Sequence, residues 1–295
     1  MPSRRIEFTV SDLENGFAVG EILKNHNVSL SLVRSLKRVE RGITLNGEHI
    51  RTVDCVTAGD VVALNIPDDE RPAVPVNLQA GVVYEDDDII VFDKPAGMTV
   101  HPVRDQRDDT LANFFAWHLM QQGRSAAFRP INRLDRNTSG LMVAALHRMS
   151  AAALSGQTEK TYVAVCEGRL EGSGIIEAPI RRREGYGISR EVGEGGEYAL
   201  TRYESLASCD ELSLLSVRID TGRMHQIRVH MAHIGHPLTG DDMYGGSLSY
   251  IQRHALHCDR LSFCHPVSGQ PLSFESQLPG DMLTLIGKFF SHWSK

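Results

Sequence analysis

The stretch Arg133-Leu134-Asp135-Arg136-Asn137-Thr138-Ser139-Gly140 places one carboxylate between two arginines, just before the apolar run Leu141–Leu146. A loop carboxylate with cations on both sides tends to stay ionised, because nearby positive charge favours the charged form. An ionised carboxylate in a fixed position can act as a nucleophile or as a base. An aspartate in such a turn also commonly caps the next element, so this stretch alone leaves both interpretations open.

A second dense segment lies far downstream and contains Gly222-Arg223-Met224-His225-Gln226-Ile227-Arg228-Val229-His230-Met231. It continues to Gly240-Asp241-Asp242-Met243-Tyr244-Gly245. With these two segments the sequence resembles the RluA-type pseudouridine synthases, whose signatures are similar to Arg-Leu-Asp-x-x-Thr-Ser-Gly and Gly-Arg-x-His-Gln-Ile-Arg-Val-His-Met. Three further matches stand in the order of that family: Lys160–Val165, Leu256–His257 with Leu261–Pro266, and Lys94–Gly97 with His101–Pro102.

Length and composition set outer limits on the protein. A chain of 295 residues suggests about two domains, and 41% hydrophobic residues are enough to bury a core. No apolar run approaches the ~20 residues of a membrane span, and no apolar stretch follows the basic N-terminus, so we expect neither membrane association nor a signal peptide. Five cysteines without a Cys-x-x-Cys pair indicate reduced thiols in a cytoplasmic protein.

The net charge of −6 arises in one connecting region. Residues 67–94 carry two basic and eight acidic side chains, so basic and acidic side chains balance in the rest of the chain. An RNA-binding protein of this composition therefore needs its basic side chains gathered on one face.

Residues 1–66 have the pattern of a small α/β module. Helices are expected at 18–27 and from Ser29 or Ser31 to Arg41, followed by a strand, an Asn-Gly hairpin turn at 46–47 and a strand at 61–64. This order resembles the S-four-type RNA-binding module. Four basic residues would share one face of the second helix and contact RNA, although a charge run is also typical of a plain solvated face. They are Arg34, Lys37, Arg38 and Arg41.

Residues 67–79, rich in proline and acidic residues, are expected to form a linker, and residues 80–295 the catalytic domain. Strands are expected at 81–85, 88–92, 161–167, 174–179, 199–207 and 212–219. Helices are expected at 149–157 and 224–234, with a mobile loop at 190–197. Many strands crossed by few helices predict an α+β domain whose mixed, mainly antiparallel β-sheet is flanked by helices.

The resemblance implies an isomerase that breaks the glycosidic bond of a uridine, turns the base and rejoins it through carbon. This reaction oxidises nothing and releases nothing, so we expect no cofactor and no metal. The resemblance makes Asp135 the catalytic carboxylate, whether it attacks the sugar, attacks the base or removes a sugar proton. It makes Arg228 the partner that keeps this carboxylate ionised and aligned through paired hydrogen bonds, with Arg223 as the rival candidate or a phosphate ligand.

The resemblance also assigns residues to the uridine itself. Tyr162 would pack on the uracil and help to remove its proton, and Leu256 would pack on the other side. From pattern alone, both would be read as ordinary strand residues. A base inside folded RNA has to be flipped out, at a cost on the order of a few kcal/mol. The predicted substrate-binding residues are Leu256, Arg223, His225, Gln226, Asn137 and Arg133.

One position departs from the family pattern. Asn132 stands where the family commonly has His, and we expect it to shape the loop or contact RNA rather than transfer protons.

Two other classes of protein compete with this interpretation. His230, His233 and His236 are spaced like metal ligands, but no His-Glu-x-x-His occurs, and Gly235 should end the helix before the third histidine. An RNA-binding or ribosome assembly factor without chemistry is the second alternative. The preferred prediction is a monomeric enzyme acting on large-subunit ribosomal RNA, with transfer RNA as the alternative substrate.

Overall fold

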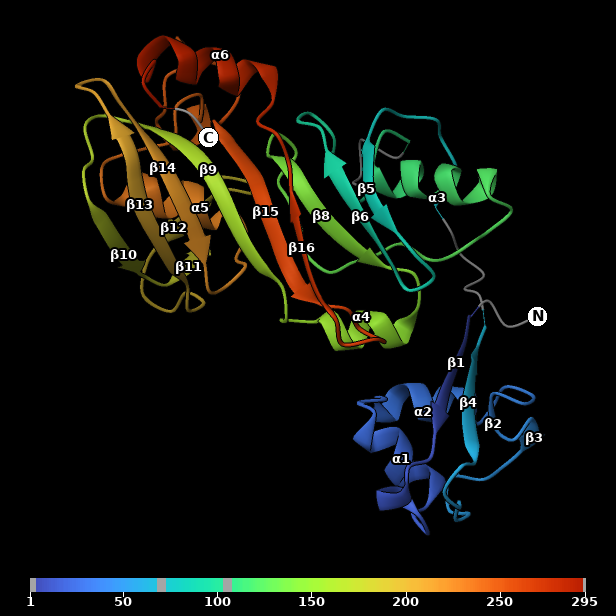
Figure 1. Cartoon of the computed structure of the whole chain (residues 1–295). Coiled ribbons are helices and arrows are strands. Elements are labelled where there is room, and N and C mark those ends of the chain that lie inside the picture. Colours follow the sequence, from blue (N-terminus) through green and yellow to red (C-terminus); the bar gives the residue numbers. More distant parts are fainter. Residues whose placement is uncertain (1–3, 68–72, 103–107, 294–295) are drawn as a thin grey trace.

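The computed structural model describes residues 4–67, 73–102 and 108–293. Its N-terminal part is a four-stranded antiparallel sheet in the order β1-β4-β2-β3, with two short helices packed on it (Figure 1). Asn46 and Gly47 both have positive φ, at 51° and 88°, and form the expected two-residue hairpin turn between β2 and β3. The elements are β1 (Arg4–Thr9), η1 (Asp12–Glu14), α1 (Val19–Asn25), α2 (Leu30–Leu36), β2 (Ile43–Leu45), β3 (Glu48–His49) and β4 (Val61–Ile66).

The second helix is shorter than the sequence predicted. Ser29 caps α2 by accepting a hydrogen bond from the Leu32 N–H, but the helix ends at Leu36 rather than Arg41. The chain turns back there, and a Cβ on Gly42 would lie only 2.2 Å from the Leu36 carbonyl oxygen. The prediction that four basic residues share one helical face is therefore wrong, although all four are exposed: Arg34, Lys37, Arg38 and Arg41.

The larger sheet has ten strands within the described residues. Its main path is β10-β13-β14-β9-β15-β8-β6-β5, with β16 beside β15 and β7 beside β8, and only the β15–β8 pair is parallel. This confirms the predicted mixed, mainly antiparallel α+β architecture. The strands are β5 (Gly81–Glu85), β6 (Ile89–Lys94), β7 (Arg129–Pro130), β8 (Ser139–Ala145), β9 (Glu159–Glu167), β10 (Ser173–Glu177), β13 (Leu200–Ser208), β14 (Leu212–Ile219), β15 (Leu256–Cys264) and β16 (Pro271–Glu275).

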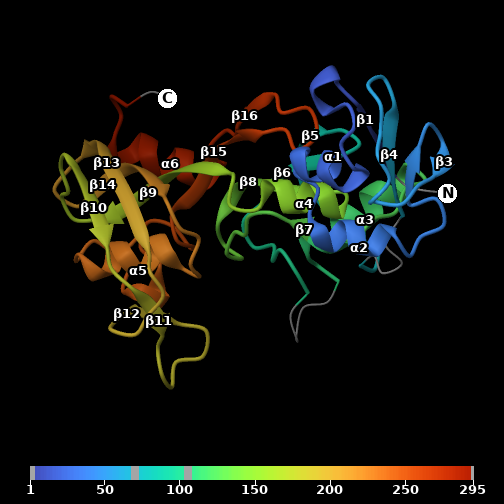
Figure 2. The same cartoon turned by 90° about the horizontal axis from the view of Figure 1, so that it is seen from below.

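Helices cover both faces of this sheet (Figures 1 and 2). Alternate side chains of β14 point to opposite faces: Leu214 packs in the cluster with α6, and Leu215 packs in the cluster with α5. A small separate sheet, β11–β12, lies where a mobile loop was expected, so that expectation is wrong for residues 190–192. The remaining elements are α3 (Leu111–Gln121), α4 (Arg148–Leu154), β11 (Ile180–Arg182), β12 (Arg190–Val192), α5 (Gln226–His233), η2 (Asp242–Tyr244) and α6 (Gly280–Phe289).

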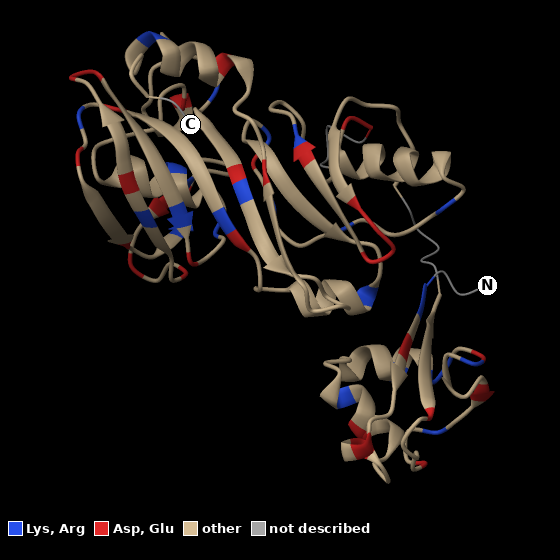
Figure 3. Cartoon of the chain, viewed as in Figure 1, with Lys and Arg blue, Asp and Glu red and all other residues tan. Residues whose placement is uncertain are grey.

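The N-terminal part docks on the larger one beside α4 (Figure 1). Arg4 of β1 donates two hydrogen bonds to Asp88, at 2.7 and 3.0 Å, and His147 contacts the same carboxylate at 2.8 Å. Met149 of α4 packs in the N-terminal hydrophobic cluster. The acidic turn after β5 is thus partly neutralised by contact with the N-terminal part (Figure 3). In the expected acidic linker, residues 68–72 lie outside the described residues.

Among the described residues, no helix is both long and apolar enough to cross a membrane. All five cysteines are free thiols in this structure, two of them buried.

The parallel contact between β8 and β15 depends on a glycine. Gly140 lies opposite Cys258, with a φ of 110° that side-chain-bearing residues rarely adopt. A Cβ at this position would lie 2.2 Å from the Cys258 carbonyl oxygen. This close approach brings the loop before β8, which carries Asp135, beside the start of β15.

We expect Gly140→Ala to lower the free energy of unfolding by at least about 3 kcal/mol. Alanine would have to adopt a strained φ, and its Cβ would also clash with the backbone of Cys258. Gly287→Ala is the matched control: its position in α6 is exposed with nothing within 4 Å, so a gain of up to about 1 kcal/mol is expected. Urea denaturation of both variants measures the difference. Equal stability of the two would contradict this account of the β8–β15 contact.

Candidate active site

Asp135 lies in the loop between β7 and β8, and a buried lysine holds this loop from behind. Lys94, at the end of β6, is fully buried and donates from Nζ to the carbonyl oxygens of Pro95, Met98 and Arg136 at 2.9–3.1 Å. Burial lowers the pKa of Lys94 to about 7, and the nearby Asp135 carboxylate opposes that effect. The lysine therefore ties the 95–98 loop to the Asp135 loop.

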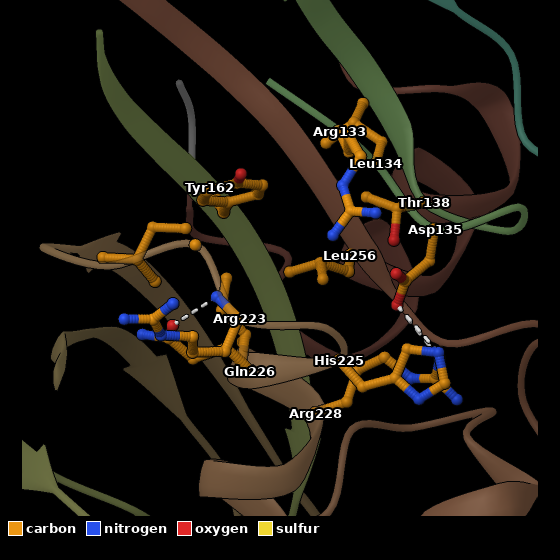
Figure 4. Close-up of a pocket in the computed structure, with 13 residues that line it drawn as sticks. Arg133, Leu134, Asp135, Thr138, Tyr162, Arg223, His225, Gln226, Arg228 and Leu256 are labelled. Carbon is orange, nitrogen blue, oxygen red and sulfur yellow. Dashed lines mark hydrogen bonds and ion pairs between the residues drawn. The ribbon is translucent and has the colours of Figure 1, made fainter. Parts of the chain in front are cut away.

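Asp135 meets Arg228 across the cleft. Arg228 Nη1 donates to Asp135 Oδ2 at 3.0 Å (Figure 4). The Arg228 side chain is 6% exposed and lies in the first turn of α5, whereas the Asp135 side chain is 25% exposed and opens to the cleft. The ion pair that the resemblance implied is present. Arg223, the rival candidate, pairs instead with Glu197 at 2.5 Å.

A second carboxylate holds the other side of the same guanidinium. Asp241, 1% exposed on its side chain, accepts from Arg228 Nε at 2.7 Å and from Nη2 at 2.8 Å. Burial alone would lower the pKa of Arg228, but hydrogen bonding and charge from Asp241, together with Asp135, raise it above its ordinary value. Arg228 is therefore a fixed cation between two carboxylates.

Tyr162 and Leu256 form an apolar wall beside this ion pair. They come from the neighbouring strands β9 and β15, and in the view of Figure 4 Leu256 lies between Tyr162 and Asp135. Both are buried, at 4% exposure. Burial raises the pKa of Tyr162 well above its ordinary value, so its hydroxyl keeps its proton near neutral pH.

The remaining predicted residues line the same cleft in different ways. Arg133 is exposed at the rim, and Asn137 is half-buried there. Gln226 is engaged inside the protein, because its amide bonds Thr221, the Arg223 N–H and the Leu200 carbonyl. The cleft brings together all nine predicted catalytic and substrate-binding residues, and the four basic residues of the N-terminal part do not line it.

Asn132, the departure from the family pattern, is buried and bonds the backbone of β8. Its side chain donates to the Leu141 carbonyl at 3.2 Å and accepts from the Val143 N–H at 2.9 Å. This contact shapes the loop that leads to Asp135, which is one of the two roles expected for it.

Sequence reasoning missed three residues of the site. Asp241 and Tyr244 belong to the Gly240–Gly245 motif, but nothing in the sequence shows that they face Arg228 and His225. His254 lies 2.8 Å from the Thr138 hydroxyl, and burial, with Arg228 nearby, lowers its pKa to about 3. It is a neutral ring in the cleft wall.

Two of the three histidines spaced like metal ligands are engaged elsewhere. Both ring nitrogens of His230 contact protein groups, Thr201 Oγ1 and the Ala178 carbonyl, and His236 Nδ1 contacts the Glu167 carbonyl. In the described part of the chain, the group with ligand spacing is Asp86, Asp88 and His265. Its carboxylates accept hydrogen bonds from Tyr84 and Arg4, which is the pattern of a polar cluster between side chains.

Comparison with known proteins gives consistent matches. The family model for RNA pseudouridylate synthase matches residues 88–233. The Bacillus subtilis protein named "Uncharacterized RNA pseudouridine synthase YhcT" is 35% identical over 297 residues, covering 98% of each chain. "Ribosomal large subunit pseudouridine synthase D" of Xylella fastidiosa is 35% identical, covering 94% of this chain and 90% of its own. The solved structure of "Human RNA Pseudouridylate Synthase Domain Containing 1" is 26% identical, with a TM-score of 0.55 over 68% of this chain and 83% of its own.

We expect Asp241→Ala to destabilise the protein by about 3–5 kcal/mol, because it removes the main partner of a buried guanidinium. Asp242→Ala is the control: the neighbouring aspartate is exposed, and its loss should change stability by less than about 0.5 kcal/mol. Chemical denaturation measures both. If the two variants unfolded alike, Asp241 would not be what holds Arg228.

Proposed function

Because this chain belongs to the RNA pseudouridine synthase family of isomerases, we propose that Asp135 is its catalytic carboxylate and large-subunit ribosomal RNA its substrate. The observation that carries the proposal is the Asp135–Arg228 ion pair at 3.0 Å beside the Tyr162–Leu256 wall. The name of the Xylella fastidiosa relative supports the choice of ribosomal RNA.

In the reaction, the bond between C1′ and N1 of the uridine breaks and a bond between C1′ and C5 forms. C5 loses a proton and N1 gains one, so atoms balance without an external reactant. Asp135 is the group that meets the nucleotide, because its carboxylate opens to the cleft while Arg228 and Asp241 lie behind it. The guanidinium compensates the negative charge of Asp135 and fixes its orientation, as a charge-assisted hydrogen bond does.

The resemblance placed Tyr162 and Leu256 on opposite sides of the uracil, but their neighbouring strands put both on one wall of the cleft, and the base packs on this wall. Tyr162 and Leu256 offer a ring and a branched chain, on which a detached uracil can stack without hydrogen bonds that would stop it turning. The raised pKa of Tyr162 favours this packing role over removal of the C5 proton, because a neutral phenol is a poor base. The uridine can reach this wall only if it is flipped out of the folded RNA. Arg133, Asn137 and Arg223, at the rim of the cleft, are candidate contacts for the RNA backbone.

We propose the same division of the chain into domains that the sequence predicted. Residues 1–66 form the S-four-type module, 67–79 the linker and 80–295 the catalytic domain. The module would bind RNA phosphates through its exposed basic residues. Those residues are Arg34, Lys37, Arg38 and Arg41.

Asp135→Asn is expected to abolish pseudouridine formation while RNA affinity stays within about twofold, because the amide keeps the shape of the carboxylate and loses its charge. The measurement is carbodiimide labelling of pseudouridine, read by mass spectrometry because the isomerisation itself changes no mass, in ribosomal RNA and transfer RNA from a strain lacking the gene and treated in vitro with each protein, together with filter binding. Turnover by the variant would overturn the catalytic assignment. Pseudouridine formed by the parent only in transfer RNA would overturn the substrate, and a parent that binds RNA without turnover would favour an assembly factor.

Arg228→Lys should lower kcat by about 100-fold, because an ammonium group cannot bond two carboxylates at once in the way that a guanidinium fork does. Arg202→Lys is the matched control, since Arg202 pairs with Asp220 on the surface at 3.0 Å, where such pairs contribute about 0–1 kcal/mol. Steady-state assays with RNA in excess compare the two. A parent-like kcat in Arg228→Lys would show that catalysis needs only a positive charge beside Asp135 and not the paired hydrogen bonds of a guanidinium.

A further inference from the structure

The supporting loop, residues 240–246, lies directly behind the candidate site. Glycines at both ends allow its close approach to neighbouring backbone: a Cβ on Gly240 would lie 2.0 Å from the Arg253 carbonyl oxygen, and one on Gly246 would lie 2.0 Å from that of Leu238. The loop presents Asp241 to Arg228 and Tyr244 to His225. Its tight fit indicates that these two side chains are held in place.

The hydrogen bonds of Tyr244 determine where its single hydroxyl proton points. The oxygen accepts from the Arg190 N–H at 2.9 Å and lies 2.7 Å from His225 Nδ1. Burial raises the pKa of Tyr244, so the hydroxyl is protonated near neutral pH. The Arg190 N–H is a donor, and the Ser189 hydroxyl lowers the pKa of Tyr244 as a second donor does, so the phenolic proton goes to Nδ1 of His225.

His225 is consequently fixed in one form. Burial lowers its pKa, although Asp135 opposes this, so the ring is neutral near pH 7. A neutral ring that accepts at Nδ1 carries its proton on Nε2. The backbone of His225 is left-handed, with φ at 58° just before α5, a strained conformation that persists only when its surroundings enforce it.

Arg228 and His225 both lie near the same oxygen of Asp135. Arg228 Nη1 lies 3.0 Å and His225 Nε2 lies 3.9 Å from Asp135 Oδ2. Within residues 4–67, 73–102 and 108–293, every side-chain contact of the Asp135 carboxylate goes to Oδ2. Oδ1 takes part in none of these contacts, and Asp135 lines the cleft.

We propose that Tyr244 is a positioning residue that fixes His225 with its proton on Nε2, so that His225 and Arg228 both support Oδ2 of Asp135 while Oδ1 meets the nucleotide. The proposal rests on the assignment of Asp135 as the catalytic carboxylate. The 3.9 Å separation shortens to a hydrogen bond when RNA fills the cleft, as such contacts often tighten in a complex. The face of the Tyr244 ring, 4.9 Å from the Arg228 guanidinium carbon, braces the second supporting group as well.

Nitrogen NMR of ¹⁵N-histidine-labelled full-length protein tests the tautomer without any RNA. The ring-nitrogen signals that disappear in His225→Gln are those of His225. The parent and Tyr84→Phe should show His225 protonated on Nε2 alone, whereas Tyr244→Phe should show a mixture of tautomers. Tyr84→Phe is a fair control because its hydroxyl donates to Asp86 at 2.7 Å, outside the cleft. A parent ring protonated on Nδ1, or charged at pH 7, would overturn the proposal.

Kinetics on ribosomal RNA from a strain lacking the gene test the consequence. Tyr244→Phe should lower kcat about 10-fold with KM unchanged. His225→Gln should retain more activity than His225→Asn, because the glutamine amide nitrogen reaches the position of Nε2 and the asparagine nitrogen that of Nδ1. Parent-like kcat in Tyr244→Phe, or the reverse order of the His225 variants, would overturn this proposal alone. Turnover by Asp135→Asn would instead overturn the proposed function and leave the tautomer result standing.

Discussion

A single guanidinium held between two carboxylates is the constraint on which this site depends. Arg228 is almost entirely buried, and burying an unpaired cation costs several kcal/mol, so it requires compensation. Asp241 gives it a bidentate, inaccessible partner, and Asp135 gives it a second partner that opens to the cleft. The inner pair makes the outer one possible, because Arg228 cannot turn away from Asp135 without leaving Asp241.

The rest of the fold serves to bring these groups together from distant parts of the chain. The parallel contact at Gly140 sets the Asp135 loop beside β15, and Lys94 ties that loop to the end of β6. The first turn of α5 then presents Arg228 to it. Because Tyr162 and Leu256 lie on adjacent strands, the same sheet also supplies the wall on which a uracil can stack.

Much of this could be predicted from the sequence, and the limits have physical reasons. Alternating or continuous apolar runs predicted about half of the described strands, but not β8 or β15, which frame the site. The Asn46-Gly47 turn was predicted because its chemistry is local. The end of α2 was missed because it depends on the chain folding back at Gly42, which no local pattern shows. The roles of Asp241 and Tyr244 were missed for the same reason: their partners are 13 and 19 residues away, across a loop whose path only the structure gives.

The most direct test is a crystal structure of the protein bound to a ribosomal RNA fragment that contains its target uridine. We expect the uridine to be flipped into the cleft, with C1′ within about 3.5 Å of the Asp135 carboxylate and Arg228 still bonded to both aspartates. A target uridine bound away from Asp135, or an Arg228 that has released Asp241 to reach the RNA, would contradict the account.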